Sequence, residues 1–407
     1  MKVAQIPGEM IPQKGTDPEE LFVCPVASPG FNPETALELK ARLGSLLKGI
    51  RLVWTDHTPE AIFFLSGGSE RQALQKIGEK NDVLLIALPE RNGFASASEV
   101  KSYLDRSGRK SDLFNLIDYQ DIESLRFIIG IRSAVRSFSQ SRIGIVGNES
   151  DWLVNSMPDP VNLKARFGFR LVKIPWTLLR EDTNWPLSAD FLDFYSKYPS
   201  EIAGEHSRIY GKLLQVVEEN HLDGITVECF PLVQEDGVTA CPSLALLNQL
   251  GIPAGCEGDL VSLTGMLLVK AVTGQIPWMA NLTGLQNNTV LFSHCTVPLN
   301  MVDTFGFNTH YETGKGLAIQ GVLPEGDYTV LRLSVDFLSA FLAEGTATTE
   351  PRTLEACRTQ LVLHLDPESY SDLKNYPLGN HHLILPGKHA RVLKIALSYL
   401  NIPLRIH

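Results

Sequence analysis

The sequence predicts an α/β protein with two doubly wound, parallel-sheet (Rossmann-like) domains and a C-terminal domain built on a small antiparallel barrel or sheet. In the first half of the chain, short continuous apolar runs such as 21–26 and 83–90 alternate with helical segments, which indicates parallel strands buried on both faces. The same alternation starts again at residue 142. From about residue 290 the segments become alternating and glycine-rich, as antiparallel strands are.

The first predicted domain covers residues 1–140. A helix from about Thr35 to Leu47 follows the first strand, because Asn32 and Pro33 supply a cap and a first-turn proline. Residues 61–70 predict a strand and a Gly-Gly turn before the next helix. Glycines before a helix can cradle a phosphate, but the segment lacks the Lys-Ser/Thr of a Walker loop, so a plain strand-to-helix turn is favoured.

The second predicted domain covers residues 141–289, and the third covers 290–407. In the second, we expect a strand, turn and helix over 142–154, and a long helical region from 186 to 221. Its first strand lacks a complete GxGxxG fingerprint, which argues against a nicotinamide cofactor. In the third, Pro-Glu-Gly-Asp at 324–327 predicts a hairpin turn, and the chain is expected to end in a helix and a strand.

Composition restricts the class of protein. The chain has 407 residues, 44% hydrophobic and 20% charged, which is typical of a globular protein with two or three domains. A net charge of −10 argues against a broad nucleic-acid-binding surface. We expect no membrane segment and no signal peptide, because no apolar run is long enough. Six scattered cysteines without a CxxC pair favour reduced thiols and a cytoplasmic location.

Polar side chains follow several predicted strands between residues 226 and 301. Glu228 follows one apolar run, Glu257 and Asp259 follow a second, and His294 ends a third. Because the carboxyl ends of parallel strands face the ligand crevice, we expect these groups to converge. Two carboxylates at a strand end can bind a divalent cation or transfer protons. We predict that Asp259 caps the following helix while Glu257 points into the site.

The C-terminal third supplies further candidate ligand-binding residues, each with a structural alternative. His310 shares one face of a predicted strand with Glu312, and Lys315 follows in a Gly-Lys-Gly segment that is either a turn or an anion contact. Arg332 lies among apolar residues, so it is either paired or facing the site. The remaining candidates are the adjacent histidines His381 and His382, of which a strand can direct only one to the site.

Two segments resemble a known family. Cys-Glu-Gly-Asp at 256–259, followed by an apolar helix, Thr-Gly and Pro-Trp-Met-Ala-Asn-Leu at 277–282, resembles the central segment of L-fucose isomerase and its relatives. Residues 379–407 are similar to the end of the same enzymes. The resemblance implies that Glu257 is a metal ligand and acid/base residue, and that His381 is a metal ligand.

The sequence departs from the family pattern at Asn281. This residue falls where L-fucose isomerases carry a second metal-binding, proton-shuttling aspartate. An asparagine can still offer a carbonyl oxygen to a metal, but it cannot act as a base. Glu228 or Asp259 would then be the second acid/base group. His294 resembles a ligand histidine of L-arabinose isomerases and could instead bind a substrate hydroxyl or pack in the core.

The resemblance implies a metal-dependent aldose–ketose isomerase that acts on an open-chain sugar through an enediolate. An oxygen-rich ligand set with one histidine suits Mn²⁺, with Mg²⁺ or Co²⁺ as alternatives. One alternative function is a different enediolate reaction (epimerisation, C–C cleavage or carbon-unit transfer) on a modified, possibly anionic sugar. Another is a non-catalytic sugar-binding relative. The resembled enzymes are oligomers, which implies a homo-oligomer, a trimer or hexamer.

Overall fold

The computed structural model describes residues 19–180, 185–198, 204–348 and 353–405. The chain forms two compact units that divide between Ser133 and Ala134, inside helix α4 (Tyr119–Phe138). The division lies close to the predicted end of the first domain. The second unit contains both the second parallel sheet and the barrel.

The N-terminal unit is a doubly wound parallel sheet with strand order β2-β1-β3-β4-β5. Helices α1 and α4 pack on one face, and α2 and α3 pack on the other. Asn32 caps α1 by accepting hydrogen bonds from the backbone N–H groups of Glu34 and Thr35, which confirms the predicted helix start. The elements are β1 (Glu20–Val26), α1 (Pro33–Leu46), β2 (Arg51–Trp54), β3 (Ala61–Phe64), α2 (Glu70–Ile77), β4 (Asp82–Ala87), α3 (Gly93–Arg106) and β5 (Lys110–Asn115).

The second unit begins with a four-stranded parallel sheet of order β7-β6-β8-β9. Its strands are β6 (Arg142–Val146), β7 (Arg170–Ile174), β8 (Gly224–Val227) and β9 (Ala254–Cys256). Its helices are α5 (Pro160–Phe167), the 3₁₀ helix η1 (Trp176–Leu179), α6 (Ala189–Phe194), α7 (Glu205–Glu219), α8 (Phe230–Asp236), α9 (Cys241–Gln249) and α10 (Leu260–Thr273). The two parallel sheets confirm the predicted Rossmann-like architecture.

The chain then forms a closed antiparallel barrel of order β10-β11-β16-β15-β14-β17. The strands are β10 (Trp278–Gln286), β11 (Thr289–His294), β14 (Gly326–Leu333), β15 (Ala340–Ala347), β16 (Thr359–Leu365) and β17 (His381–Pro386). The remaining elements are η3 (Leu299–Met301), the two-stranded sheet of β12 (Thr304–Asn308) and β13 (Ala318–Val322), α11 (Pro367–Asn375) and α12 (Ala390–Tyr399). The barrel confirms the predicted antiparallel C-terminal architecture.

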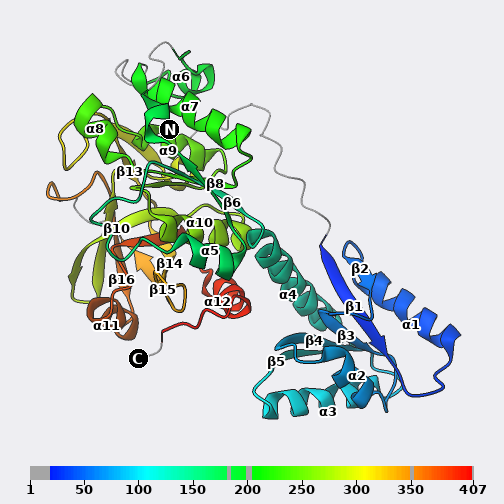
Figure 1. Ribbon diagram of the computed structural model, residues 1–407. Coiled ribbons are helices and arrows are strands. Elements are labelled where there is room, and N and C mark those ends of the chain that lie inside the picture. The colour runs from blue at the N-terminus through cyan, green and yellow to red at the C-terminus, as the bar shows by residue number, and fades with distance from the viewer. Residues whose placement is uncertain (1–18, 181–184, 199–203, 349–352, 406–407) are drawn as a thin grey trace. The chain divides into compact units, whose positions relative to one another are not determined.

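Helix α10 joins the parallel sheet to the barrel. Its residues from Leu260 to Val269 are all buried, because the helix packs on β8 and β9 and also on β14 and β17 (Figure 1). A Cβ atom on Gly265 would lie 2.4 Å from a methyl of Leu383, so the glycine allows the helix to approach the barrel closely. This packing brings the carboxyl end of β9 beside the first residue of β17.

Several predicted elements are wrong. Residues 148–159 form turns and irregular structure rather than a helix, and α5 starts only at Pro160. Strand β13 pairs with β12, whereas β14 pairs with β15 and β17, so no hairpin joins β13 to β14. The C-terminal segment forms a single bridge between Ala340 and Leu404 instead of a strand. In each case the sequence pattern covers only a few residues, and contacts with distant parts of the chain decide which structure the segment adopts.

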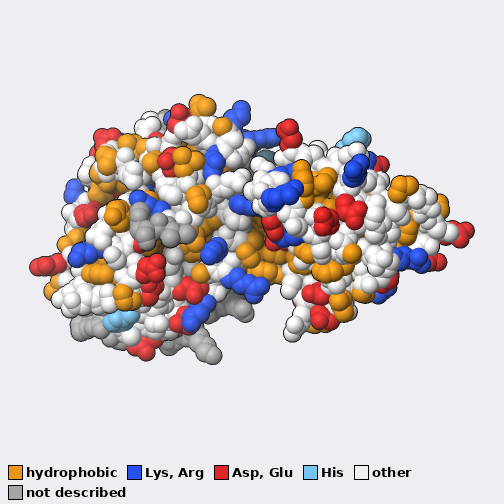
Figure 2. Space-filling view, turned by 90° about the horizontal axis from the view of Figure 1, so that it is seen from below, with side chains coloured by type: hydrophobic (Ala, Val, Ile, Leu, Met, Phe, Trp, Pro, Cys, Tyr) orange, Lys and Arg blue, Asp and Glu red, His pale blue; other side chains and the backbone are white. Residues whose placement is uncertain are grey.

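Charged side chains of both signs are mixed with hydrophobic ones over the face of the molecule drawn in Figure 2. Within the described ranges, every helix is too short or too polar to cross a membrane.

Candidate metal and acid–base site

Glu257 occupies a tight loop between β9 and α10. Its φ of +62° is unusual for a residue with a side chain, and Gly258 follows with a φ of +69°. A Cβ atom on Gly258 would lie only 2.2 Å from the backbone oxygen of Asn148. The backbone N–H of Ser150 donates to the backbone oxygen of Glu257 at 3.0 Å. The loop after β6 therefore fixes the position from which the Glu257 side chain projects.

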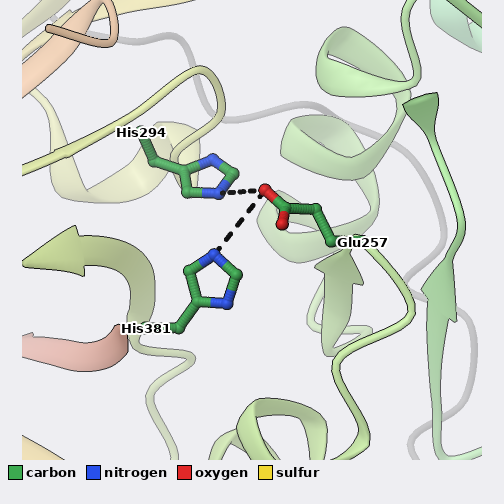
Figure 3. A group of neighbouring side chains, drawn as sticks. All are labelled: Glu257, His294 and His381. Atoms are coloured by element: carbon green, nitrogen blue, oxygen red, sulfur yellow. Dashed lines mark ion pairs between the residues drawn. The ribbon is translucent and has the colours of Figure 1, made fainter. Parts of the chain in front are cut away.

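The Glu257 carboxylate points towards two imidazole rings (Figure 3). Its Oε1 lies 3.8 Å from Nε2 of His294, which ends β11, and 3.6 Å from Nε2 of His381, which begins β17. One ligand atom from each of the three residues lies within 4.8 Å of the others. This buried group can hold a divalent metal ion, with one oxygen and two nitrogen ligands.

The hydrogen-bonding state of the two rings fits a metal ligand set. Within the described residues, neither ring nitrogen of His294 has a hydrogen-bond partner, and Nε2 of His381 also lacks one. Only 5% of His294 and none of His381 is exposed to solvent. A buried nitrogen without a partner loses its interaction with water and gains nothing in return. A cation between the rings and the carboxylate would satisfy Nε2 of each ring.

The charges of the three side chains depend on one another. Burial opposes ionisation of Glu257, but the positive charge of His381, with smaller contributions from His294 and the Trp152 hydrogen bond, outweighs it and lowers the pKa of Glu257 to about 2. Burial also opposes protonation of His381, yet Glu257 and Asp259 raise its pKa to about 9. For His294, burial and the neighbouring positive charge of His381 lower the pKa to about 3. Without a metal, the site at neutral pH therefore holds a carboxylate, an imidazolium and a neutral imidazole.

Asp259 supports the metal-binding group from behind. Its Oδ2 lies 2.9 Å from Nδ1 of His381, so Nε2 of that ring faces Glu257. Oδ1 accepts a hydrogen bond from the backbone N–H of Ser262 at 2.7 Å, which confirms the predicted cap of α10. Arg332 lies 3.5 Å from Oδ2 and donates to the Ser156 hydroxyl at 2.6 Å. Asp259 and Arg332 thus form a buried ion pair that orients the His381 ring, one of the three side chains that could hold a metal.

Two further candidates from the sequence, Glu228 and Asn281, are held by hydrogen bonds to neighbouring residues. Oε2 of Glu228 accepts a hydrogen bond from the backbone N–H of Asn148 at 2.8 Å, in the same loop that contacts Gly258. Asn281 pairs with His381 across β10 and β17. Its Oδ1 accepts from Nδ2 of Asn380 at 2.6 Å, so a neighbouring amide already binds the oxygen that was predicted to bind metal.

His381 and His382 behave as adjacent strand residues do, with their side chains on opposite faces. The ring of His382 lies inside the barrel, 5.7 Å from that of Phe292 and 6.0 Å from that of Phe341. Its Nδ1 lies 2.9 Å from the backbone oxygen of Asn380. Burial, together with nearby positive charge, lowers its pKa to about 3, so it is neutral. His382 therefore packs as a core residue of the barrel.

The segment that carries His310, Glu312 and Lys315 is a turn between β12 and β13, not the strand that was predicted. The expectation that alternation places His310 and Glu312 on one face is therefore wrong. His310 is buried, and burial together with Arg358 lowers its pKa despite the charge of Glu257. The Nζ of Lys315 donates to the backbone oxygen of Gln234 at 3.2 Å, so it fastens this turn to α8.

No sequence pattern pointed to the aromatic side chains that lie beside Glu257. The Nε1 of Trp152 donates to Oε2 of Glu257 at 2.7 Å. The ring of Trp152 lies edge-on to that of Phe230, with centroids 4.6 Å apart, and Phe230 in turn contacts His310 at 5.5 Å. Half of Trp152 is exposed, so its ring borders the approach to the carboxylate from solvent.

The glycine loop of the N-terminal unit lies between β3 and α2 and is contacted by side chains of the same unit. The Ser96 hydroxyl donates to the Glu70 carboxylate at 2.7 Å, and that hydrogen bond, with backbone N–H groups of the loop, lowers the pKa of Glu70. A crevice of about 780 Å³ lies beside the loop, and its charged lining residues are Lys40, Glu70 and Arg71. The loop is thus the strand-to-helix turn that the sequence favoured, with the Glu70 carboxylate hydrogen-bonded to Ser96.

The amino-acid sequence was also compared with known proteins. No protein-family model matches the chain, and no curated protein matches it.

Proposed function

We propose that the protein is a metal-dependent enzyme that interconverts an aldose and a ketose. The observation that carries the proposal is the buried group of Glu257, His294 and His381, in which a carboxylate meets ring nitrogens that have no hydrogen-bond partner among the described residues. A divalent cation held there would stabilise the negative charge that develops on two neighbouring oxygens of an open-chain sugar. The resemblance to L-fucose isomerase supports the choice of substrate class.

The chain's own residues would divide the remaining work. Glu257 is ionised at neutral pH, so it can be a ligand and accept a proton. Asp259 is a positioning residue, because it is fully buried and holds the His381 ring. Trp152 fixes one oxygen of Glu257 and, with Phe230, offers an apolar surface to the carbon–hydrogen face of a sugar.

The metal is expected to be Mn²⁺ or another first-row divalent ion. Two imidazoles and one carboxylate are less rich in oxygen than the ligand set inferred from the sequence. Co²⁺, Fe²⁺ and Zn²⁺ also accept such a set, whereas Mg²⁺ prefers oxygen. Elemental analysis of the purified protein by plasma mass spectrometry would identify the ion that the site retains.

Asn281 favours one alternative to isomerisation. Its amide is bound to Asn380 where the resembled isomerases place a second carboxylate, so the site has one acid/base group fewer at this position. A metal enzyme with the same fold could then catalyse epimerisation, C–C cleavage or carbon-unit transfer on a modified, possibly anionic sugar. Such an enzyme would retain the metal-binding group but would not convert simple aldoses.

Hydrogen exchange distinguishes the two candidates. The metal-stripped protein is loaded with Mn²⁺ and incubated with a panel of aldoses and ketoses in D₂O, and loss of the C1 and C2 proton signals is followed by NMR. Isomerisation predicts exchange together with ketose formation, and Glu257→Gln should abolish both. Glu368→Gln, which alters an exposed carboxylate on α11, should leave them unchanged. Mn²⁺ binding without exchange on any sugar would refute isomerisation and favour the alternative reaction.

A further inference from the structure

The N-terminal sheet reverses its winding direction between β1 and β3. From β1 the chain passes through α1 to β2 on one side of β1, whereas β3 and β4 follow on the other side (Figure 1). Helix α1 packs on one face of the sheet, and α2 packs on the opposite face. The chain therefore leaves the carboxyl ends of these two neighbouring strands in opposite directions. In open α/β sheets, ligands bind in the crevice that forms at such a point.

The crevice of about 780 Å³ in the N-terminal unit lies at this reversal. Its lining comes from four segments, which are the loop after β1, helix α1, the loop after β3 and the first turn of α2. The volume falls within the range of about 300–1,000 Å³ that small-molecule sites in proteins occupy. The strand order and the crevice are separate observations, and both indicate a ligand site at the same place.

Hydrogen bonds between the two strand ends fix the walls of the crevice. The backbone N–H of Ala27 donates to Oε1 of Gln72 at 3.0 Å. The backbone N–H of Ser28 donates to the Ser66 hydroxyl at 2.9 Å. Each bond joins the loop after β1 to the segment that links β3 with α2. A ligand would therefore enter a site that is already formed, and binding would require little ordering of the protein.

Two cations line the crevice without an ion-pair partner among the described residues. They are Lys40, on α1, and Arg71, in the first turn of α2. The carboxylate in the lining is that of Glu70, which accepts a hydrogen bond from the Ser96 hydroxyl on α3 at 2.7 Å. The lining thus sets two cations against one carboxylate, and a bound anion would supply the partner that Lys40 and Arg71 lack.

The chemistry of the lining suits a phosphate attached to an organic group. A phosphate monoester carries about 1.5–2 negative charges at neutral pH, whereas a carboxylate carries one, so two cations match the phosphate better. The guanidinium of Arg71 can also bind two phosphate oxygens at once. Apolar residues would contact the organic part, and they are Pro25, Ala27, Pro29, Phe31, Ala36 and Leu65.

We propose that this crevice is a second ligand site of the protein and binds an organic phosphate monoester through Lys40 and Arg71. Side chains hold the phosphate, rather than the N–H groups of the glycine loop, so the absence of a Walker motif is no obstacle. All lining residues belong to the N-terminal unit, and the proposal does not depend on the isomerase function. A nucleoside monophosphate and a sugar phosphate both have this chemistry.

Isothermal titration calorimetry of the whole, metal-stripped chain tests the site with AMP, glucose 6-phosphate and inorganic phosphate. Stripping prevents phosphate from binding through a metal ion. At least one organic phosphate should bind saturably and more tightly than inorganic phosphate, and added salt should weaken it. Lys40→Gln/Arg71→Gln should lower that affinity at least about 10-fold, because it removes charged hydrogen-bond donors. Lys48→Gln/Arg106→Gln removes two exposed cations of the same unit and should match wild type.

Ala36→Phe tests the apolar side of the crevice without changing its charge. It should weaken the organic phosphate and leave inorganic phosphate unaffected, with circular dichroism confirming that each variant is folded. Failure of both organic phosphates to bind wild type, or equal affinity in Lys40→Gln/Arg71→Gln and its control, would overturn the site. Inorganic phosphate that binds as tightly as AMP and glucose 6-phosphate would overturn the assignment of an organic ligand.

Discussion

Asp259→Asn tests how the buried ion pair supports the metal-binding group. The substitution keeps the size of the side chain and leaves an oxygen that can still cap α10, since Asn caps helices as well as Asp does. It removes the negative charge that faces Arg332, of which only 1% is exposed. It also removes the charged partner of His381.

The expected cost follows from these contacts. Leaving one partner of a buried ion pair uncompensated destabilises proteins by about 3–5 kcal/mol. Because the cap is retained, the whole loss is assigned to the charge, and Asp259→Ala should lose about 1 kcal/mol more. Removing the carboxylate behind a ligand histidine should also weaken metal binding by about 10- to 100-fold.

Urea unfolding followed by circular dichroism, together with calorimetric Mn²⁺ titration, measures both effects. Asp366→Asn is the matched control, because Asp366 caps α11 in the same way but is exposed. The control should change the free energy of unfolding by less than about 0.5 kcal/mol and leave metal binding unaltered. If Asp259→Asn were as mild as the control in both assays, the supporting role of the ion pair would be refuted.

Two further predictions concern backbone strain and pH. Gly258 and Gly274 both have a φ near +70°, but only at Gly258 would a Cβ atom collide with backbone atoms. Gly258→Ala should therefore destabilise the protein by several kcal/mol and weaken metal binding, whereas Gly274→Ala should cost only about 1–2 kcal/mol. Equal losses in urea unfolding would contradict this prediction. In the metal-free protein, stability should fall as the pH drops from about 6.5 towards 3, because the unfolded chain binds protons that His294 and His382, with pKa values of about 3, do not bind when folded. His381 holds its proton more tightly when folded, with a pKa of about 9, so its contribution to the free energy of unfolding should be lost progressively between about pH 6.5 and 9. A rise in unfolding free energy between pH 7 and 9 would refute the assignment.

The fold class could be predicted because it depends on local patterns. Continuous apolar runs alternating with helices identify buried parallel strands, and both parallel sheets confirm this. The pairing of β13 could not be predicted in the same way. Its alternating pattern fits either β12 or β14, and the choice is made by contacts such as the hydrogen bond from the backbone N–H of Ile319 to the backbone oxygen of Cys295, far away in sequence.

In the candidate site too, some residues could be predicted from local sequence patterns and others could not. Glu257 and His381 were identified because one follows a strand and the other begins one, and because both segments resemble the isomerase family. His294 was kept open between ligand and core residue, and the structure places its ring with theirs. Trp152 and Arg332 act through partners that are distant in sequence, so no local pattern could reveal their contacts with Glu257 and Asp259.

The central claim is that Glu257, His294 and His381 hold a divalent cation, and a direct Mn²⁺ titration tests it. Electron paramagnetic resonance of the metal-stripped protein should show one bound Mn²⁺ per chain. His294→Gln should lose that binding, whereas His382→Gln, which changes an equally buried histidine inside the barrel, should keep it in the folded protein. Stoichiometric binding that survives both His294→Gln and Glu257→Gln, or no binding in the wild-type protein, would contradict the account.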